Sequence, residues 1–158
     1  MSITTSSKKE MNLRVRIPSW VSGNVVININ AKPAATGTPG TYVSLNRKWF
    51  NNDKITFTLP MSFSTVKYTG LDQVNGNMDR YALLYSPLLM AFQGPLTGPD
   101  KVANIKSEPA SLQDILSQVK DSPLQFNVAG YDAYKFVPYW QATGEFTCFP
   151  IVQSSMNN

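Results

Sequence analysis

The longest apolar run of the chain is Tyr81–Phe92, with the sequence YALLYSPLLMAF. Pro87 interrupts this run and Gly94-Pro95 follow it closely, so it is too short and too broken to span a bilayer. Bulky aliphatic and aromatic residues bounded by turn signals are typical of strands covered on both faces. The run therefore predicts one buried strand, or two strands bent at Ser86-Pro87.

Shorter segments predict the other strands. Apolar and polar residues alternate in Asn12–Ile17, Val25–Asn30 and Lys54–Leu59, as they do in strands with one solvated face. The remaining strand candidates are Ser2–Thr5, Thr41–Leu45, Ser62–Tyr68, Leu124–Ala129, Tyr134–Trp140 and Glu145–Val152. Proline, glycine and polar residues predict turns or irregular structure in Ala31–Gly40, Asn46–Asp53, Gly70–Asp79 and Pro95–Ala110.

One helix signal stands out late in the chain. Ser111 and Asp114 have the spacing of a capping box, and the apolar residues that share a face after it are Leu112, Ile115, Leu116 and Val119. Short strands at regular spacing are typical of an antiparallel β-sandwich or jelly roll. We expect an all-β fold of this kind as a single domain over residues 1–152, with a loop and helix excursion at 96–123 and a disordered tail at 153–158.

The charge composition bears on which kinds of partner the chain can bind. The chain of 158 residues has a net charge of +4, but its 14 basic side chains are scattered, so nothing in the sequence predicts a nucleic-acid or membrane partner. The N-terminal MSITTSSKKE lacks the apolar region of a signal peptide. Localisation is left open, and a periplasmic or secreted parent protein is compatible with the sequence.

The sequence lacks most of the residue types on which catalytic and metal sites depend. Without histidine there is no Ser-His-Asp or Cys-His catalysis and no histidine-ligated metal, and the single Cys148 allows no multi-thiolate site. Cys148 lies in an aromatic segment that favours a buried, inert thiol. The acidic residues lie mostly in loops, where solvated side chains are the simpler expectation: Asp53, Asp72, Asp79, Asp100, Glu108, Asp121 and Asp132. We predict no catalytic residue and no metal site in this chain.

Aromatic side chains are the remaining ligand candidates. Exposed, rigid rings can stack on sugars, so the weak candidates for a carbohydrate-binding face are Trp20, Trp49, Tyr139 and Trp140. Sandwich cores and corners use tryptophan in the same positions, and that interpretation is favoured here. It applies most directly to Trp20 beside Pro18 and to Trp49 beside Phe50.

Four segments in a row carry a family resemblance. They are LRVRIPSW (Leu13–Trp20), VVININ (Val25–Asn30), PGTYVSLNRKW (Pro39–Trp49) and DKITFTLPMSF (Asp53–Phe63). This order resembles the region that follows the catalytic barrel in the β-L-arabinofuranosidase family of glycoside hydrolases. YALLYSPLLMAF is similar to the next strand of the family, with Ser86 at the position of a family glycine, and PYWQATGEFTCFPIV (Pro138–Val152) is similar to its closing segment.

The resemblance implies that this chain corresponds to a non-catalytic part of a longer enzyme. Family members have an α/α barrel followed by β-sandwich domains, and they hydrolyse terminal β-L-arabinofuranosyl linkages. Their cysteine nucleophile, with a glutamate and further cysteines around zinc, belongs to the barrel, and no residue here matches those motifs. The implied role is a non-catalytic accessory β-sandwich that packs against its own barrel and joins a homodimer contact. The alternative is a carbohydrate-binding module for plant-type oligosaccharides.

Overall fold

The computed structural model describes residues 1–70, 79–96 and 103–154. These residues form β-strands and two short 3-10 helices, and most strand pairs are antiparallel. The all-β antiparallel fold predicted from the sequence is confirmed, whereas the jelly-roll connectivity stays a prediction. The chain forms two compact units, Met1–Ser62 and Phe63–Asn158. The buried side chains form two clusters, one in each unit, and the single domain over 1–152 stays a prediction.

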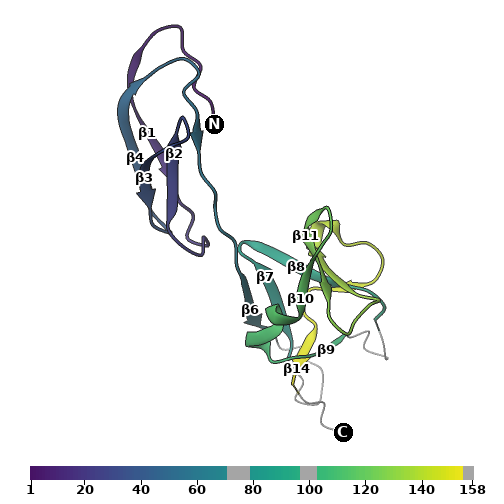
Figure 1. Cartoon of the computed structure of the whole chain (residues 1–158). Coiled ribbons are helices and arrows are strands. Elements are labelled where there is room, and N and C mark those ends of the chain that lie inside the picture. Colours follow the sequence, from purple (N-terminus) through teal and green to yellow (C-terminus); the bar gives the residue numbers. More distant parts are fainter. Residues whose placement is uncertain (71–78, 97–102, 155–158) are drawn as a thin grey trace. The chain divides into compact units, whose positions relative to one another are not determined.

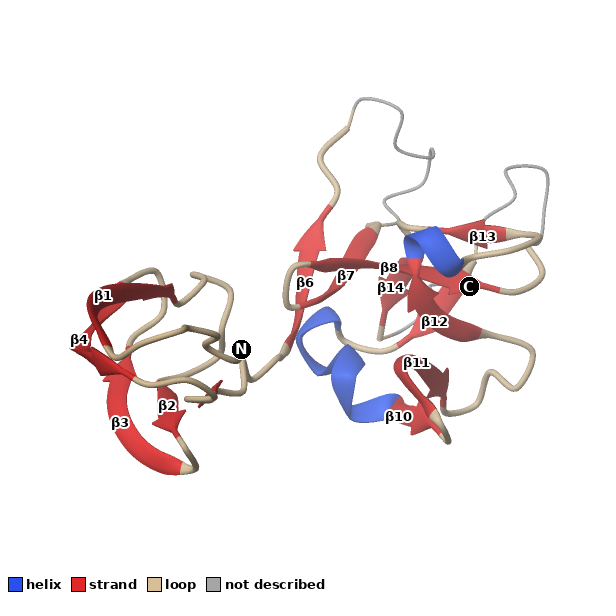
Figure 2. Cartoon of the chain, turned by 90° about the horizontal axis from the view of Figure 1, so that it is seen from above, coloured by secondary structure: helices blue, strands red, loops and turns tan. Residues whose placement is uncertain are grey.

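Unit 1 contains two small sheets that share one core (Figures 1 and 2). Its strands are β1 (Lys9–Arg16), β2 (Val25–Ile29), β3 (Lys32–Gly37), β4 (Tyr42–Trp49) and β5 (Ile55–Thr56). β1 pairs with β4 over eight residues, and β2 lies between β3 and β5. The buried side chains from both sheets form one cluster, which comprises Ile17, Val21, Val25, Ile27, Ile29, Leu45, Trp49 and Ile55.

The segment Ala31–Gly40, predicted as a loop, contains strand β3. A two-residue turn joins β2 to β3, and both of its residues have positive φ, 51° at Asn30 and 65° at Ala31. Pro33 is tolerated because β3 pairs on one side only, with β2. Gly37 is buried, and a Cβ there would lie 2.5 Å from side-chain atoms of Ile17 and Val43. The loop prediction was wrong for Lys32–Gly37, because these residues form an edge strand in which proline and glycine are tolerated.

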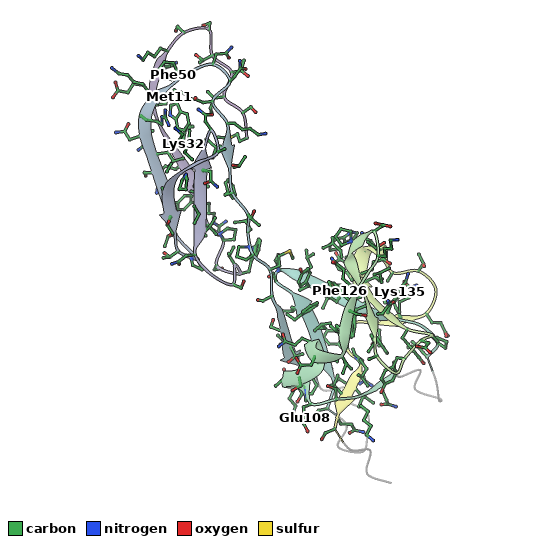
Figure 3. All side chains as sticks on the ribbon, in the orientation of Figure 1. Met11, Lys32, Phe50, Glu108, Phe126 and Lys135 are labelled. Atoms are coloured by element: carbon green, nitrogen blue, oxygen red, sulfur yellow. The ribbon has the colours of Figure 1, made fainter. Side chains whose placement is uncertain are left out.

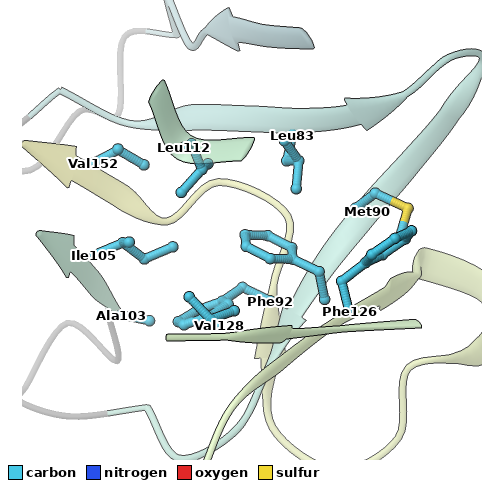
Figure 4. Close-up of a cluster of buried hydrophobic side chains, with 10 residues drawn as sticks. Leu83, Met90, Phe92, Ala103, Ile105, Leu112, Phe126, Val128 and Val152 are labelled. Carbon is cyan, nitrogen blue, oxygen red and sulfur yellow. The ribbon is translucent and has the colours of Figure 1, made fainter. Parts of the chain in front are cut away.

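Unit 2 contains a larger sheet and a short pair of strands. Its strands are β6 (Phe63–Lys67), β7 (Tyr81–Tyr85), β8 (Leu88–Gln93), β9 (Asn104–Lys106), β10 (Leu116–Val119), β11 (Ser122–Val128), β12 (Lys135–Pro138), β13 (Phe146–Thr147) and β14 (Ile151–Gln153). The sheet order is β10-β11-β12-β8-β7-β6, and β13 also pairs with β8. β14 and β9 form a parallel pair. The core shown in Figure 4 collects side chains from β7, β8, β9, β11, β12 and β14, together with Ala103 and Leu112.

The apolar run Tyr81–Phe92 forms the hairpin β7–β8 at the centre of this sheet. Ser86 and Pro87 make the turn between Tyr85 and Leu88, which are paired, as the bend predicted at this point requires. Ser86 adopts a φ of 50°, a conformation that glycine would adopt more readily. The tight turn therefore forms with serine at the position where the resembling family has glycine.

The predicted helix is present but short. A 3-10 helix, η1, spans Pro109–Ile115, and its N-cap is Glu108 with no side-chain cap, so the predicted capping by Ser111 was wrong. Pro109 sets the start of this helix. Leu116–Val119 leaves the helical pattern because it pairs with β11 as strand β10. Leu112, one of the predicted inner-face residues, is buried in the core.

Several predictions concern residues at the edges of the described ranges. Ser2–Thr5 contributes a single bridge, Ser2 to Lys54, and backbone bonds at Ile3 in place of a full strand. The predicted tail begins at Gln153, but this residue belongs to β14. Residues 71–78 of the Gly70–Asp79 loop, 97–102 of the irregular segment and 155–158 of the tail lie outside the described residues.

Candidate functional site

The four aromatic candidates occupy different environments. Trp49 has no exposed surface, and its indole Nε1 donates to the carbonyl of Met11 at 3.0 Å. Trp20 is half-buried and packs against the core of unit 1. Tyr139 and Trp140 are 54% and 53% exposed. The sugar-stacking candidates that remain accessible are therefore Tyr139 and Trp140 in unit 2.

Tyr139 and Trp140 belong to the second 3-10 helix, η2 (Tyr139–Gln141), which directly follows β12. The two ring planes cross at 88° with their centroids 5.7 Å apart. This pair therefore does not form a binding face of two coplanar rings. One ring could stack on a sugar while the other borders it.

Polar side chains adjoin this helix. Lys135 Nζ donates to Gln125 Oε1 at 3.2 Å, and Gln125 Nε2 donates to Gln141 Oε1 at 3.4 Å. Gln125 and Gln141 also line a surface depression of about 270 Å³ together with residues 121–124. Amide and ammonium groups of this kind can hydrogen-bond sugar hydroxyls. Figure 3 shows Lys135 among the side chains of unit 2. Sequence reasoning missed these three polar residues, since only pairing β11 with β12 brings them together.

The remaining candidate groups are the thiol of Cys148 and the acidic side chains. Cys148 is half-buried, and desolvation raises the pKa of its thiol, which agrees with the inert thiol expected from the sequence. Within the described residues, no three His, Cys, Asp or Glu side chains gather closely enough to hold a metal ion. The described part of the chain therefore does not fit the zinc centre that the resemblance places in the barrel. Asp72 and Asp100 lie outside the described residues.

Asp53 departs from the expectation of solvated loop acids. It is 6% exposed, and its carboxylate accepts hydrogen bonds from the Phe50 backbone N–H at 2.9 Å and from Asn30 Nδ2 at 2.7 Å. These two bonds, and the nearby Arg47 charge, lower the pKa of Asp53. The carboxylate closes the turn after β4 and ties it to the β2–β3 turn, so its role is structural.

This arrangement predicts a pH-dependent contribution to stability from Asp53. Because its pKa is lowered on folding, the stabilisation is present above the unfolded value of 3.8 and is lost as pH falls through the lower folded value. We expect Asp53→Asn to lower the Tm by several degrees at neutral pH, with a difference that shrinks in acid. Thermal melts followed by circular dichroism across this range test it. The control Glu10→Gln removes an exposed acid of the same unit, and an equal Tm loss in both variants would contradict the assignment.

These features define the class of the molecule: two β-rich units, the second of which exposes an aromatic pair, Tyr139 and Trp140, at helix η2. Among those residues, no helix combines the length and the apolar character needed to cross a membrane. Residues 1–61 match the family model of the β-L-arabinofuranosidase GH127 middle domain. This match confirms the resemblance, and it coincides with the segments through Phe63 that carry it most clearly.

Solved structures support the same fold. The chain is similar to a structure titled glycoside hydrolase, with a TM-score of 0.56 and 15% identity, covering 96% of this chain and 30% of that one. It is also similar to Ara127N-Se, a GH127 β-L-arabinofuranosidase from Geobacillus stearothermophilus T6, with a TM-score of 0.57 and 15% identity, covering 96% of this chain and 28% of that one. The chain thus spans less than a third of either structure. No curated protein sequence matches it.

Proposed function

We propose that this chain is a non-catalytic accessory β region of a glycoside hydrolase that acts on L-arabinofuranosyl-type glycans. The observation that supports this most directly is the middle-domain match over residues 1–61, together with structural similarity to less than a third of two much longer enzymes. In this role the chain packs against an α/α catalytic barrel, covers its apolar flank and joins a homodimer contact. Zinc and the cysteine nucleophile belong to that barrel.

Two measurements test the accessory role. The purified chain, incubated with an aryl β-L-arabinofuranoside, is expected to give no turnover above buffer. Sustained turnover that is lost in a Cys148→Ala variant would overturn the proposal. Reading the coding frame on both sides of this sequence is the second test: a helical domain with several cysteines and glutamates supports the accessory role, and an unrelated neighbouring domain counts against it.

A second candidate function is binding of arabinose-containing oligosaccharides. It is favoured by the exposed Tyr139 and Trp140 and by the amide side chains Gln125 and Gln141 that line the depression beside η2. The perpendicular ring planes limit stacking to one ring at a time, which predicts weak binding of a short glycan.

Replacing Trp140 by alanine tests the binding candidate. If this ring carries the stacking contact, affinity for the oligosaccharide falls by about fivefold, because one stacked aromatic contributes about 1 kcal/mol. Isothermal titration calorimetry with wild type and variant measures the change. Phe50→Ala is the matched control, since Phe50 is a 46% exposed aromatic of unit 1. Absence of binding by wild type, or equal loss in both variants, eliminates the candidate.

A further inference from the structure

The two units carry opposite net charge. Residues 1–62 hold eight Lys and Arg against two Asp and Glu, a formal charge of +6, whereas residues 63–158 hold six against eight, a charge of −2. One of the two acids of unit 1 is the buried Asp53, so Glu10 is its one exposed carboxylate. The cations of unit 1 thus face solvent almost without compensating charge.

Part of this charge lies on the outer face of the β1–β4 pair. Side chains alternate along both strands, and every second residue is exposed. The register places the outward residues opposite one another as Glu10 and Lys48, Asn12 and Asn46, Arg14 and Ser44, and Arg16 and Tyr42. We name these eight residues the outer ribbon. It presents two guanidinium groups, one ammonium, one carboxylate, two amides, one serine hydroxyl and one exposed phenol on a single sheet face.

An aromatic ring orients one arginine of the outer ribbon, and neither arginine is paired with a carboxylate. The Arg14 guanidinium lies over the Tyr42 ring, 4.7 Å from its centroid. Stacking orients the guanidinium plane while its N–H edge remains available for a bidentate bond to a carboxylate. Among the described residues the one ion pair is Lys67–Asp79 in unit 2, so neither Arg14 nor Arg16 is paired with a carboxylate.

The chemistry of the outer ribbon fits a carboxylated glycan better than a nucleic acid. Eight extended residues span about 27 Å, and only three cations lie along this length beside the acid Glu10. Strong backbone binding of nucleic acid needs many phosphate contacts and no interspersed acid. In contrast, the neutral Asn12, Ser44 and Asn46 offer donors and acceptors that match sugar hydroxyls. Tyr42, 56% exposed, adds a ring edge and a phenol.

We propose that the outer ribbon of unit 1 binds an acidic polysaccharide, a chain of uronic acid residues whose carboxylates pair with Arg14 and Arg16. The amides and hydroxyls of the ribbon bind the sugar hydroxyls between the charged positions. This surface would hold the protein on a charged glycan. It belongs to unit 1, whereas the exposed Tyr139 and Trp140 of η2 belong to unit 2. The inference does not depend on the accessory role, because it rests on the charge and register of unit 1 alone.

The test uses polygalacturonate and its fully methyl-esterified form, which has the same sugar backbone without the charge. Calorimetric titration of the intact chain is expected to show binding to polygalacturonate and at least about tenfold weaker binding to the ester, since exposed ion pairs contribute modestly and two of them are lost. No binding to polygalacturonate, or equal binding of both polymers, overturns the proposal.

Variants separate this site from general electrostatic attraction. The double variant Arg14→Gln/Arg16→Gln is expected to bind polygalacturonate about tenfold more weakly, and the control Lys32→Gln/Lys54→Gln, which removes the same charge outside the β1–β4 pair, less than about threefold. Circular dichroism and an unchanged Tm confirm that both variants fold. Equal losses in the two variants, or equally tight binding of a DNA duplex, would show non-specific attraction and refute the proposal.

Discussion

Replacing Trp49 by alanine is expected to lower the free energy of unfolding of unit 1 by about 3–5 kcal/mol, the usual cost of removing a large buried aromatic side chain. Trp49 has no exposed surface and packs in the cluster that joins the two sheets of unit 1. Its loss also leaves the Met11 carbonyl without the indole donor at 3.0 Å and removes the ring beneath the Arg47 guanidinium. The cavity, the lost hydrogen bond and the lost cation contact all lower the free energy of unfolding.

Urea denaturation of wild type and variant measures this loss. Hydrogen–deuterium exchange of peptides within residues 1–62 locates it, since faster exchange there identifies unit 1 as the part that opens. Phe50→Ala is the matched control, because Phe50 is the neighbouring aromatic in the chain and is 46% exposed. The control is expected to cost under about 1 kcal/mol. A Trp49 variant as stable as the Phe50 variant would mean that Trp49 is not the centre of this core.

The sequence predicted strands best where alternation or a long apolar run decides the structure. The alternation that begins at Asn12 predicts which side chains of β1 face the core, and the burial along this strand alternates in the same way. The bend at Ser86-Pro87 follows because proline cannot continue a central strand. In both places the local pattern and the tertiary structure require the same conformation, so the pattern alone was sufficient.

Tertiary pairing explains the segments that the sequence misassigned. The turn at Asn30-Ala31 needs positive φ at both residues, yet it lacks the Asn-Gly signature that would have revealed a hairpin. Leu116–Val119 has helical spacing of its apolar residues, but β11 offers it a strand partner. Each error concerns a long-range contact.

The candidate sites were less predictable than the fold. The sequence favoured a core or corner position for the tryptophans, and Trp49 is fully buried, but Trp140 is 53% exposed. Exposure depends on which face of an element the partner strands cover, and this information is absent from a short segment. The outer ribbon could not be predicted for the same reason. The sequence predicts that Arg14 and Arg16 lie on the solvent-exposed face of one strand, but only the register with β4 places Tyr42 and Ser44 beside them.

Replacing Phe92 by alanine is expected to lower the free energy of unfolding of unit 2 by about 3–5 kcal/mol. Its fully buried ring stacks on Tyr134 at 4.7 Å between centroids with planes 5° apart, and it contacts Phe136 at 4.9 Å. Phe146→Ala is the matched control, since Phe146 is 41% exposed on β13 and should cost under about 1 kcal/mol. Urea denaturation gives both values, and faster hydrogen exchange in β8 and β12 should accompany the Phe92 loss. Equal stability of the two variants would place the centre of the unit 2 core elsewhere, because a fully buried ring that contacts two others cannot be removed without leaving a cavity.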